Sequence, residues 1–207
     1  SSSRLTNTAR DGTELISAGP AHVPIEISSA PDGLRFQGGH DGWLRTHGLT
    51  HARTLELTSD GRGLAGEDML FAVEEADKVI FQKALARGVD AGLLFQIRFH
   101  LHPEVDAAID MGGAAISLAL RSGEIWVLRC EPNAELSLEP SVYLETGRLK
   151  PRATKQVVLS ARAMEYATRI RWSLAKAHLL IYALILKSNT YVIIEFDCLK
   201  TCVRLKF

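Results

Sequence analysis

Alternation of apolar and polar residues with a period of two is the feature that most constrains how this chain folds. Successive side chains of a strand point to opposite faces of a sheet, so such runs are typical of half-buried strands. They predict about ten short strands, and hence an all-β, antiparallel β-sandwich of two packed multi-stranded sheets. The runs lie at residues 23–28, 34–37, 53–68, 93–102, 114–130, 134–145, 154–163 and 167–175.

Turn residues divide several of these runs. The pairs Asp60-Gly61 and Ser122-Gly123 predict hairpins, because residues of these types suit tight turns between strands. Asp41-Gly42 predicts a further turn, with Trp43 at the start of the next strand. Only residues 74–87 have a helix-compatible pattern, so we expect one short helix inside a loop.

The end of the chain differs in composition from the rest. Residues 179–186 are continuously apolar, and residues 191–196 resume the apolar pattern after a polar break. The first run is too short to span a bilayer, which needs about 20 residues. The two runs predict either a buried hairpin or an exposed, aggregation-prone segment. We expect the sandwich domain to occupy residues 1–176, and residues 177–207 form an apolar tail that we do not assign to it.

Charge and cysteine content exclude few classes of partner. The 207 residues contain 24 Lys and Arg against 24 Asp and Glu, so the net charge implies no partner. Residues 148–176 hold eight bases and one acid, which suits either an anionic polymer or a solvated strand face. The bases are not interleaved with exposed aromatic residues, which argues against nucleic acid. The three cysteines match neither a disulfide framework nor a zinc signature.

Three longer strings carry a resemblance to a known family. They are GGHDGWLRTHGLTHARTLELTSDGRGLAGEDML at residues 38–70, FQIRFHLHPEV at 95–105 and ELSLEPSVYLETGRLKPRATKQVVLSARA at 135–163. In this order they resemble the C-terminal β-sandwich of heparinase II/III-like proteins, and IRWSLAK at residues 170–176 resembles its closing strand. The resemblance covers the sandwich region, residues 1–176, and not the tail.

The resemblance implies a polysaccharide lyase that cleaves uronic-acid-containing glycans such as glycosaminoglycans by β-elimination. A cation or strong donors neutralise the sugar carboxylate, a Tyr or His removes the adjacent proton, and an acid protonates the leaving oxygen. In the family, a helical α/α-toroid domain ahead of the sandwich supplies the tyrosine. The first strands of the sandwich supply a catalytic histidine and, in some members, zinc ligands.

This chain departs from the family pattern at its beginning. It shows no toroid, and residues 1–5 resemble the sequence that follows the histidine-bearing strands. We therefore carry over no catalytic residue and expect a fragment that is inactive without the missing N-terminal toroid. The resemblance implies the bacterial periplasm or cell envelope, although no signal peptide or transmembrane segment is visible in the sequence.

The segment at residues 95–105 contains the clearest candidate metal ligands. Gln96, Arg98, His100 and His102 should share one face of a strand. His100 and His102 would lie about 6–7 Å apart along that strand, close enough for one metal ion. Further ligands would have to come from His40, Asp41, His47 or His51. The alternative is that this polar face contacts only water or a neighbouring domain.

Other residues are weaker candidates for chemistry. His40 is a candidate general base and Tyr143 a candidate proton-transfer group, although neither has a visible partner. Trp126 and Trp172 alternate with polar residues as core residues do, whereas Trp43 remains a candidate for sugar stacking. The basic segment with Arg148, Lys150, Arg152 and Lys155 is the best candidate for contact with an anionic polysaccharide.

Three functional hypotheses follow from the sequence. The first is the sandwich part of a lyase, and the alternative is a non-catalytic carbohydrate-binding, polyanion-binding or interaction module. The third is a truncated or frame-disrupted product without activity, which the unusual apolar end favours.

Overall fold

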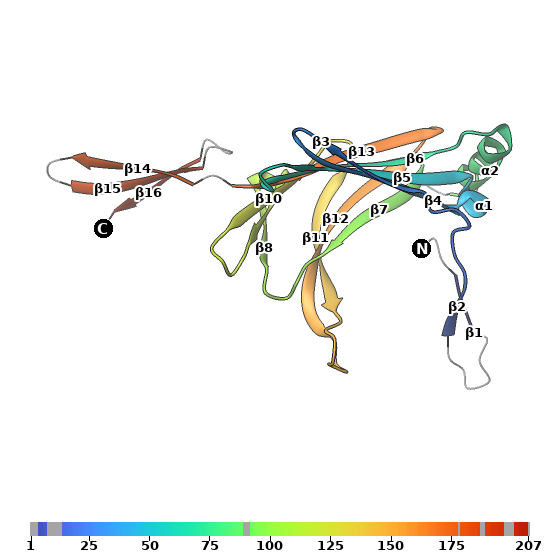
Figure 1. Cartoon of the computed structure of the whole chain (residues 1–207), viewed down its shortest axis with the longest axis horizontal. Helices are drawn as coiled ribbons and strands as arrows, with labels where there is room; N and C mark the ends of the chain where they lie inside the picture. Colours follow the sequence, from blue (N-terminus) through green and yellow to red (C-terminus); the bar gives the residue numbers. More distant parts are fainter. Residues whose placement is uncertain are drawn as a thin grey trace.

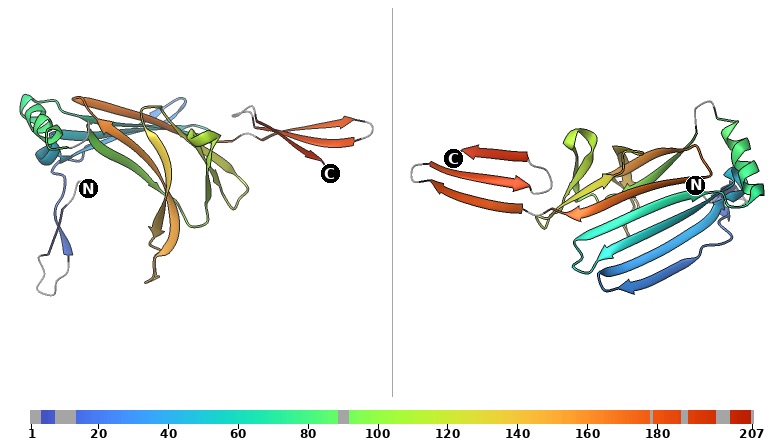
Figure 2. Two further views of the ribbon diagram at one scale, coloured as in Figure 1. Left: turned by 180° about the vertical axis from the view of Figure 1, so that it is seen from behind. Right: turned by 90° about the horizontal axis from the view of Figure 1, so that it is seen from above.

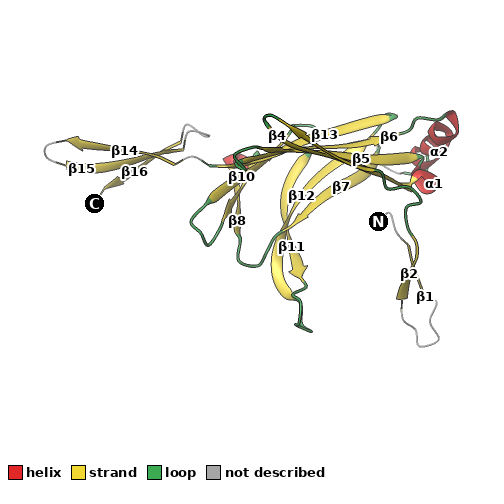
Figure 3. Ribbon diagram, viewed as in Figure 1, coloured by secondary structure: helices red, strands yellow, loops and turns green. Residues whose placement is uncertain are grey.

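Two antiparallel sheets form the body of the computed structural model, which describes residues 4–7, 14–88, 92–177, 179–186, 189–196 and 201–206. The predicted all-β sandwich is confirmed, since strands dominate the chain and pack in two layers (Figure 1, Figure 3). Two further sheets are separate from these: a two-stranded sheet of β1 (Arg4–Asn7) and β2 (Glu14–Ala18), and a three-stranded sheet near the C-terminus.

The larger sheet has eight strands in the order β3-β4-β5-β6-β13-β10-β9-β8, and Figure 2 shows how they lie side by side. Every pairing in it is antiparallel. Its strands are β3 (Ile25–Ala30), β4 (Gly33–Trp43), β5 (Leu49–Thr58), β6 (Gly63–Phe71), β8 (Asp106–Asp110), β9 (Ala115–Ala119), β10 (Ile125–Cys130) and β13 (Ala167–Lys176).

The predicted hairpins at Asp60-Gly61 and Ser122-Gly123 are confirmed. Gly61 has φ 67° and lies between β5 and β6, while Gly123 has φ 84° and lies between β9 and β10. Glycine adopts these angles without the steric penalty that a Cβ would add. The β5–β6 hairpin is the element that later positions the candidate site.

The smaller sheet has three strands in the order β11-β12-β7. They are β7 (Leu93–His100), β11 (Glu135–Tyr143) and β12 (Arg152–Ala163). The core lies between the two sheets, where Trp172 of β13 meets Phe99 of β7 with ring centroids 4.7 Å apart. Its fully or nearly buried members are Ile97, Ala107, Ile116, Leu118, Leu128, Val157, Leu159, Ala161, Ile170 and Trp172.

The larger sheet extends beyond the smaller sheet that packs on its inner face. Cross-strand partners share a face of a sheet, so the register that joins Ile27 to Phe36, Leu55, Gly66 and Trp172 places all five on the inner face. Trp172 is buried, whereas Ile27 is 70% exposed. The β3–β5 end of the inner face is therefore open, and the candidate site lies at this transition.

Two helices and a second core close the end of the sandwich. The predicted helix is confirmed as α2 (Glu75–Leu85), and a single turn, α1 (Leu44–His47), packs against it. Phe81 of α2 is fully buried and anchors the helix. The second core consists of Leu49, Leu70, Ala72, Phe81 and Ala163. No helix in the described residues is both long and apolar enough to cross a bilayer.

The predicted turn at Asp41-Gly42 is wrong. Both residues lie inside β4, where the β4–β5 register shifts between His40 and Trp43, and Trp43 ends that strand instead of starting the next. The chain reverses later, through α1 and Gly48, which has φ 67°. The carboxylate of Asp41 instead accepts the backbone N–H groups of Ala21 and His22, at 2.8 and 3.2 Å.

The apolar end forms its own sheet. The two predicted runs pair as β14 (Leu179–Leu186) and β15 (Asn189–Phe196), and β16 (Thr201–Lys206) joins them in the order β14-β15-β16. Each pairing is antiparallel. The two runs therefore pair as a hairpin. Whether their side chains are buried or exposed lies outside the described residues.

Candidate functional site

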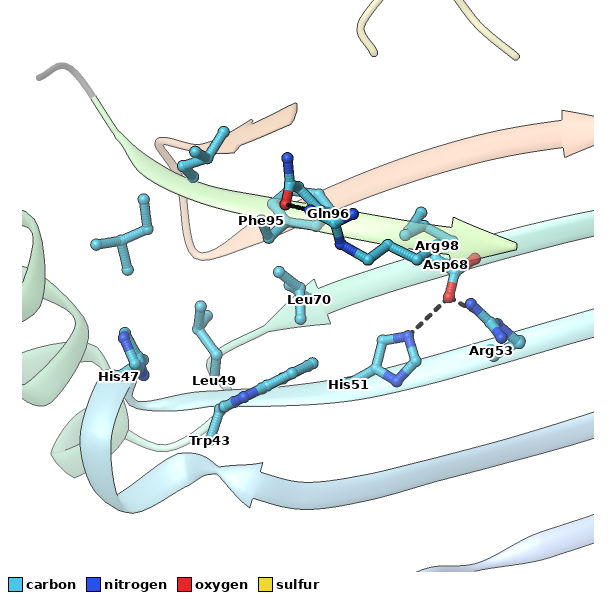
Figure 4. A pocket seen from close by; sticks show the side chains of 13 residues that line it. Trp43, His47, Leu49, His51, Arg53, Asp68, Leu70, Phe95, Gln96 and Arg98 are labelled. Carbon is cyan, nitrogen blue, oxygen red and sulfur yellow. Dashed lines mark hydrogen bonds and ion pairs between the residues drawn. The ribbon is translucent and has the colours of Figure 1, made fainter. Parts of the chain in front are cut away.

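A cavity of about 520 Å³ lies where the free edge of β7 crosses the open end of the larger sheet (Figure 4). Strands β4, β5 and β6 supply one wall and β7 supplies the other. Its lining combines aromatic, charged and aliphatic side chains: Trp43, His47, Leu49, His51, Arg53, Asp68, Leu70, Leu93, Leu94, Phe95, Gln96, Ile97 and Arg98.

Asp68 is the centre of the polar wall. Its carboxylate is only 2% exposed, and it accepts three hydrogen bonds from side chains. His51 Nε2 and Arg53 Nε both contact Oδ1 at 2.8 Å, as Figure 4 shows, and Trp172 Nε1 donates to Oδ2 at 2.9 Å. Because three donors converge on it, this buried carboxylate is well solvated by the protein itself.

The β5–β6 hairpin makes this convergence possible. Arg53 and Asp68 are direct cross-strand partners, and His51 lies two residues along β5 on the same face. Trp172 approaches from β13 because its partner on β6 is Gly66. A Cβ on Gly66 would lie 2.2 Å from the indole ring of Trp172, so only glycine leaves room for that ring.

The three donors also keep Asp68 ionised. Burial opposes the charge, yet the hydrogen bonds from His51, Arg53 and Trp172 and the charge of Arg53 outweigh it, so the pKa of Asp68 lies below its ordinary value. A carboxylate without a proton can only accept hydrogen bonds. His51 therefore carries a hydrogen on Nε2 in this arrangement.

Three rings gather beside the carboxylate cluster. The ring centroid of His40 lies 4.8 Å from that of Trp43 and 5.0 Å from that of His51, and Trp43 and His51 are 5.8 Å apart. His40 and His51 are cross-strand partners on β4 and β5. Burial, and then the neighbouring His51, lower the pKa of His40, although Asp41 partly offsets this.

The strand at residues 93–100 has the predicted alternation. Ile97 is buried and Phe99 packs on the core, whereas Gln96, Arg98 and His100 are exposed. Arg98 forms an ion pair of 2.7 Å with Glu139 and a hydrogen bond to Gln96. Arg98 and Gln96 also line the cavity, so the first half of this face belongs to the site.

His100 and His102 lie away from the cavity. His100 Nδ1 is 2.7 Å from the Ser141 hydroxyl, and the ring of His102 packs on Tyr143 with centroids 4.9 Å apart. Neither His40 nor His51 is near them by ring contact or hydrogen bond in the described chain. Across the residues whose side chains are described, no group of three or more His, Cys, Asp or Glu could hold a metal ion. Tyr143 thus has an imidazole neighbour that sequence reasoning did not find.

The four basic residues flank the tip of the β11–β12 hairpin and do not reach the cavity. Arg148 and Arg152 both pair with Glu145, at 3.0 and 3.6 Å. Lys155 donates to the Ala107 carbonyl at 2.7 Å and lies 3.8 Å from Asp106. Lys150 is exposed at the tip.

Sequence reasoning found Trp43, His40 and His51 singly but missed the cluster around Asp68. The signal that could have found it is the predicted β5–β6 hairpin, which brings HAR at residues 51–53 opposite DML at residues 68–70. Pairing these strings requires the register of the hairpin, which turn chemistry alone does not give.

Comparison with known proteins adds a family and a fold. The heparinase II/III-like, C-terminal family matches residues 3–173. FtsZ-localized protein C from Caulobacter vibrioides is 36% identical over 160 residues, which make up 77% of this chain and 26% of that protein. The chain thus spans about a quarter of the length of this curated relative.

Two solved structures share the fold at low identity. Heparinase III has a TM-score of 0.56 and 10% identity, over 90% of this chain and 28% of its own. A mutant of the heparan sulfate lyase HepC from Pedobacter heparinus has a TM-score of 0.57 and 9% identity, over 98% of this chain and 30% of its own. The likeness therefore concerns the fold alone, over less than a third of each of those chains.

Proposed function

The chain belongs to the heparinase II/III-like C-terminal family, and on this premise we propose that it forms the glycan-facing wall of a uronate-glycan lyase. In this proposal the complete lyase joins this chain to an upstream helical toroid and cleaves an acidic polysaccharide by β-elimination. The observation that carries the proposal is the cavity beside β7, which combines the indole of Trp43 with His51, Arg53 and Arg98. An aromatic face beside cationic groups suits a pyranose ring that bears a carboxylate.

The reaction needs groups that this wall can supply only in part. In β-elimination a base removes the proton next to the sugar carboxylate, the C–O bond to the leaving sugar breaks, a C=C bond forms, and the leaving oxygen takes up a proton. Arg53 and Arg98 can neutralise the carboxylate, which makes that proton more acidic. Among the described residues that line the cavity, none is a tyrosine. We therefore assign the tyrosine step to the toroid and expect this chain to bind without cleaving.

Binding to a heparan sulfate oligosaccharide tests the proposal. Arg98→Gln should weaken binding by up to about fivefold, since a solvent-exposed ion pair contributes up to about 1 kcal/mol. Arg35→Gln is the matched control, because Arg35 is also an exposed, ion-paired arginine but lies on the outer face of the larger sheet. Calorimetric titrations at low and moderate salt would measure both effects.

Two results would contradict the proposal. One is binding that does not respond to salt, since contact with a carboxylate or sulfate must weaken as salt screens it. The other is an equal loss in Arg98→Gln and Arg35→Gln, which would show that only net charge matters. In all of these titrations we expect the chain alone to form no unsaturated uronate product, which ultraviolet absorbance would detect.

The second candidate function is a non-catalytic polyanion-binding or interaction module. The observation that favours it is the β11–β12 tip, where Arg148 and Arg152 pair with Glu145 and where Lys150 and Leu149 are exposed. Lys150→Gln separates the two candidates in the same titration. A loss in this variant with none in Arg98→Gln would place binding at the tip.

We propose that the protein is located in the periplasm or cell envelope, as its family is. The curated relative bears a name that links it to FtsZ. Imaging a fluorescent fusion of this protein together with labelled FtsZ distinguishes a location in the cell envelope from one shared with FtsZ. A signal confined to the cell envelope supports the proposal, whereas a signal that follows FtsZ contradicts it.

A further inference from the structure

Two neighbouring imidazoles on the inner face each have one nitrogen fixed by the protein. His51 uses Nε2 to contact the Asp68 carboxylate at 2.8 Å. His40 uses Nδ1 to contact the backbone N–H of Gly42 at 3.2 Å. The structure records no hydrogen bond for the other nitrogen of either ring within the described residues, and no direct hydrogen bond between the rings.

The partner of each fixed nitrogen determines where the proton lies. The Asp68 carboxylate can only accept, so His51 Nε2 must donate and Nδ1 of the neutral ring keeps its lone pair. The Gly42 N–H can only donate, so His40 Nδ1 must accept and the proton of the neutral ring lies on Nε2. The remaining nitrogens are therefore one donor, on His40, and one acceptor, on His51.

His40 favours the neutral form that this assignment requires. Burial and the neighbouring His51 lower the pKa of His40. Protonation of His40 Nδ1 would also break its hydrogen bond from Gly42.

We propose that His40 and His51 form a hydroxyl-binding subsite, in which one sugar hydroxyl accepts from His40 Nε2–H and donates to His51 Nδ1. Two hydrogen bonds of about 2.8 Å that share one oxygen can join nitrogens up to roughly 5 Å apart. The ring centroids of His40 and His51 are 5.0 Å apart with an interplanar angle of 50°, so the two rings are close enough for one small group to contact both. A ligand with a donor and an acceptor on one atom, as in a hydroxyl, fits both nitrogens.

Trp43 and the adjoining cavity define the rest of the ligand. The indole ring lies within 6 Å of both imidazoles by centroid distance, at 4.8 and 5.8 Å, and presents a flat apolar surface beside the polar pair. His51 lines the cavity of about 520 Å³, and His40 adjoins it through its ring contacts with Trp43 and His51. This inference rests on the proposed function, because it assigns the hydroxyl to an acidic glycan whose carboxylate contacts the arginines.

Imidazole NMR of the purified chain tests the protonation pattern without any ligand. Long-range ¹H–¹⁵N correlations at neutral pH distinguish protonated from unprotonated ring nitrogens. We expect His51 to carry its proton on Nε2 and His40 to do the same. A proton on His51 Nδ1, or on His40 Nδ1, overturns the inference whatever the chain binds.

Titration with a heparan sulfate oligosaccharide then tests the subsite. His40→Phe keeps a ring beside Trp43 but removes the donor, and it should weaken binding by about fivefold, the effect of one typical hydrogen bond. His102→Phe is the matched control, because it removes an imidazole that lies against Tyr143 away from the cavity. The indole N–H signal of Trp172, held by Asp68, reports that each variant keeps the fold.

The outcomes separate the inference from the function on which it rests. Weaker binding in His40→Phe, with unchanged binding in His102→Phe, supports the subsite. Unchanged binding in His40→Phe overturns the subsite and leaves the proposed function standing. A wild-type chain that binds no acidic glycan overturns the proposed function, and the subsite with it.

Discussion

Replacement of Asp68 with asparagine should destabilise the fold by about 2–4 kcal/mol. The side chain keeps its shape, but one of its acceptor oxygens becomes an NH₂ group that faces donors. His51 and Arg53 are partly exposed, at 17% and 35%, so each can turn toward water. Trp172 is buried and cannot, so its indole N–H competes for the single remaining oxygen.

The magnitude follows from what the substitution removes. A hydrogen bond to a charged group contributes roughly 1.5–3 kcal/mol, and a buried donor left without a partner costs about 1–3 kcal/mol. The retained oxygen recovers part of this sum. Urea unfolding at neutral pH measures the difference, with Asp106→Asn as the control, because Asp106 is 88% exposed and its ion pair with Lys155 is long, at 3.8 Å.

The pH dependence gives this prediction a second readout. The pKa of Asp68 is depressed in the folded state, so its contribution to stability is present above its unfolded value, near pH 4 by the model-peptide figure of about 3.9. It is lost as the pH falls through the folded pKa. The difference between wild type and Asp68→Asn should therefore shrink in acid. A difference below about 1 kcal/mol at neutral pH, or one that grows in acid, would refute the reasoning.

Two further substitutions test the packing around the site. Gly66→Ala should destabilise the chain by about 1–3 kcal/mol, since the new Cβ would lie 2.2 Å from the buried ring of Trp172; a thermal unfolding midpoint equal to that of wild type would contradict this. Phe81→Ala should cost about 3–5 kcal/mol, because Phe81 is fully buried between α2 and the sheet, whereas Val79→Ala on the same helix should change little, since Val79 is 53% exposed. Equal losses in those two variants, measured by urea unfolding, would show that α2 is not held by Phe81.

The period-two pattern predicted the sandwich because it reports burial directly. In β7 the exposed Arg98 and the buried Ile97 follow the alternation residue by residue. Strand β8 was missed, although its Ala107 is 2% exposed. The string DAAID has a small core residue and acids at both ends, so it carries too little hydrophobic signal for periodicity to detect.

Local turn chemistry failed where tertiary pairing overrides it. Asp41-Gly42 has the composition of a hairpin turn, yet β4 continues through it because Gly39 and His40 pair with Ala52 and His51 on β5. The carboxylate of Asp41 caps two backbone N–H groups some twenty residues earlier in the chain, a long-range role that a dipeptide cannot reveal.

The candidate site shows the same limit. His51 and Asp68 are 17 positions apart in sequence, and Trp172 joins them from 104 positions beyond Asp68. The sequence offers each residue type, but the register of β5, β6 and β13 decides which of them meet. The basic residues near the β11–β12 tip drew attention because their charges are contiguous in sequence, whereas the cavity collects its charges from separate strands.

The indole N–H resonances of the three tryptophans test the central claim most directly. The indole N–H of Trp172 donates to Asp68 and that of Trp126 to Glu124, whereas Trp43 lines the cavity and its indole N–H has no hydrogen bond recorded among the described residues. On titration with a heparan sulfate oligosaccharide at low salt, the Trp43 signal should move while that of Trp126 stays in place. Saturable binding that leaves the Trp43 signal unmoved would contradict the account.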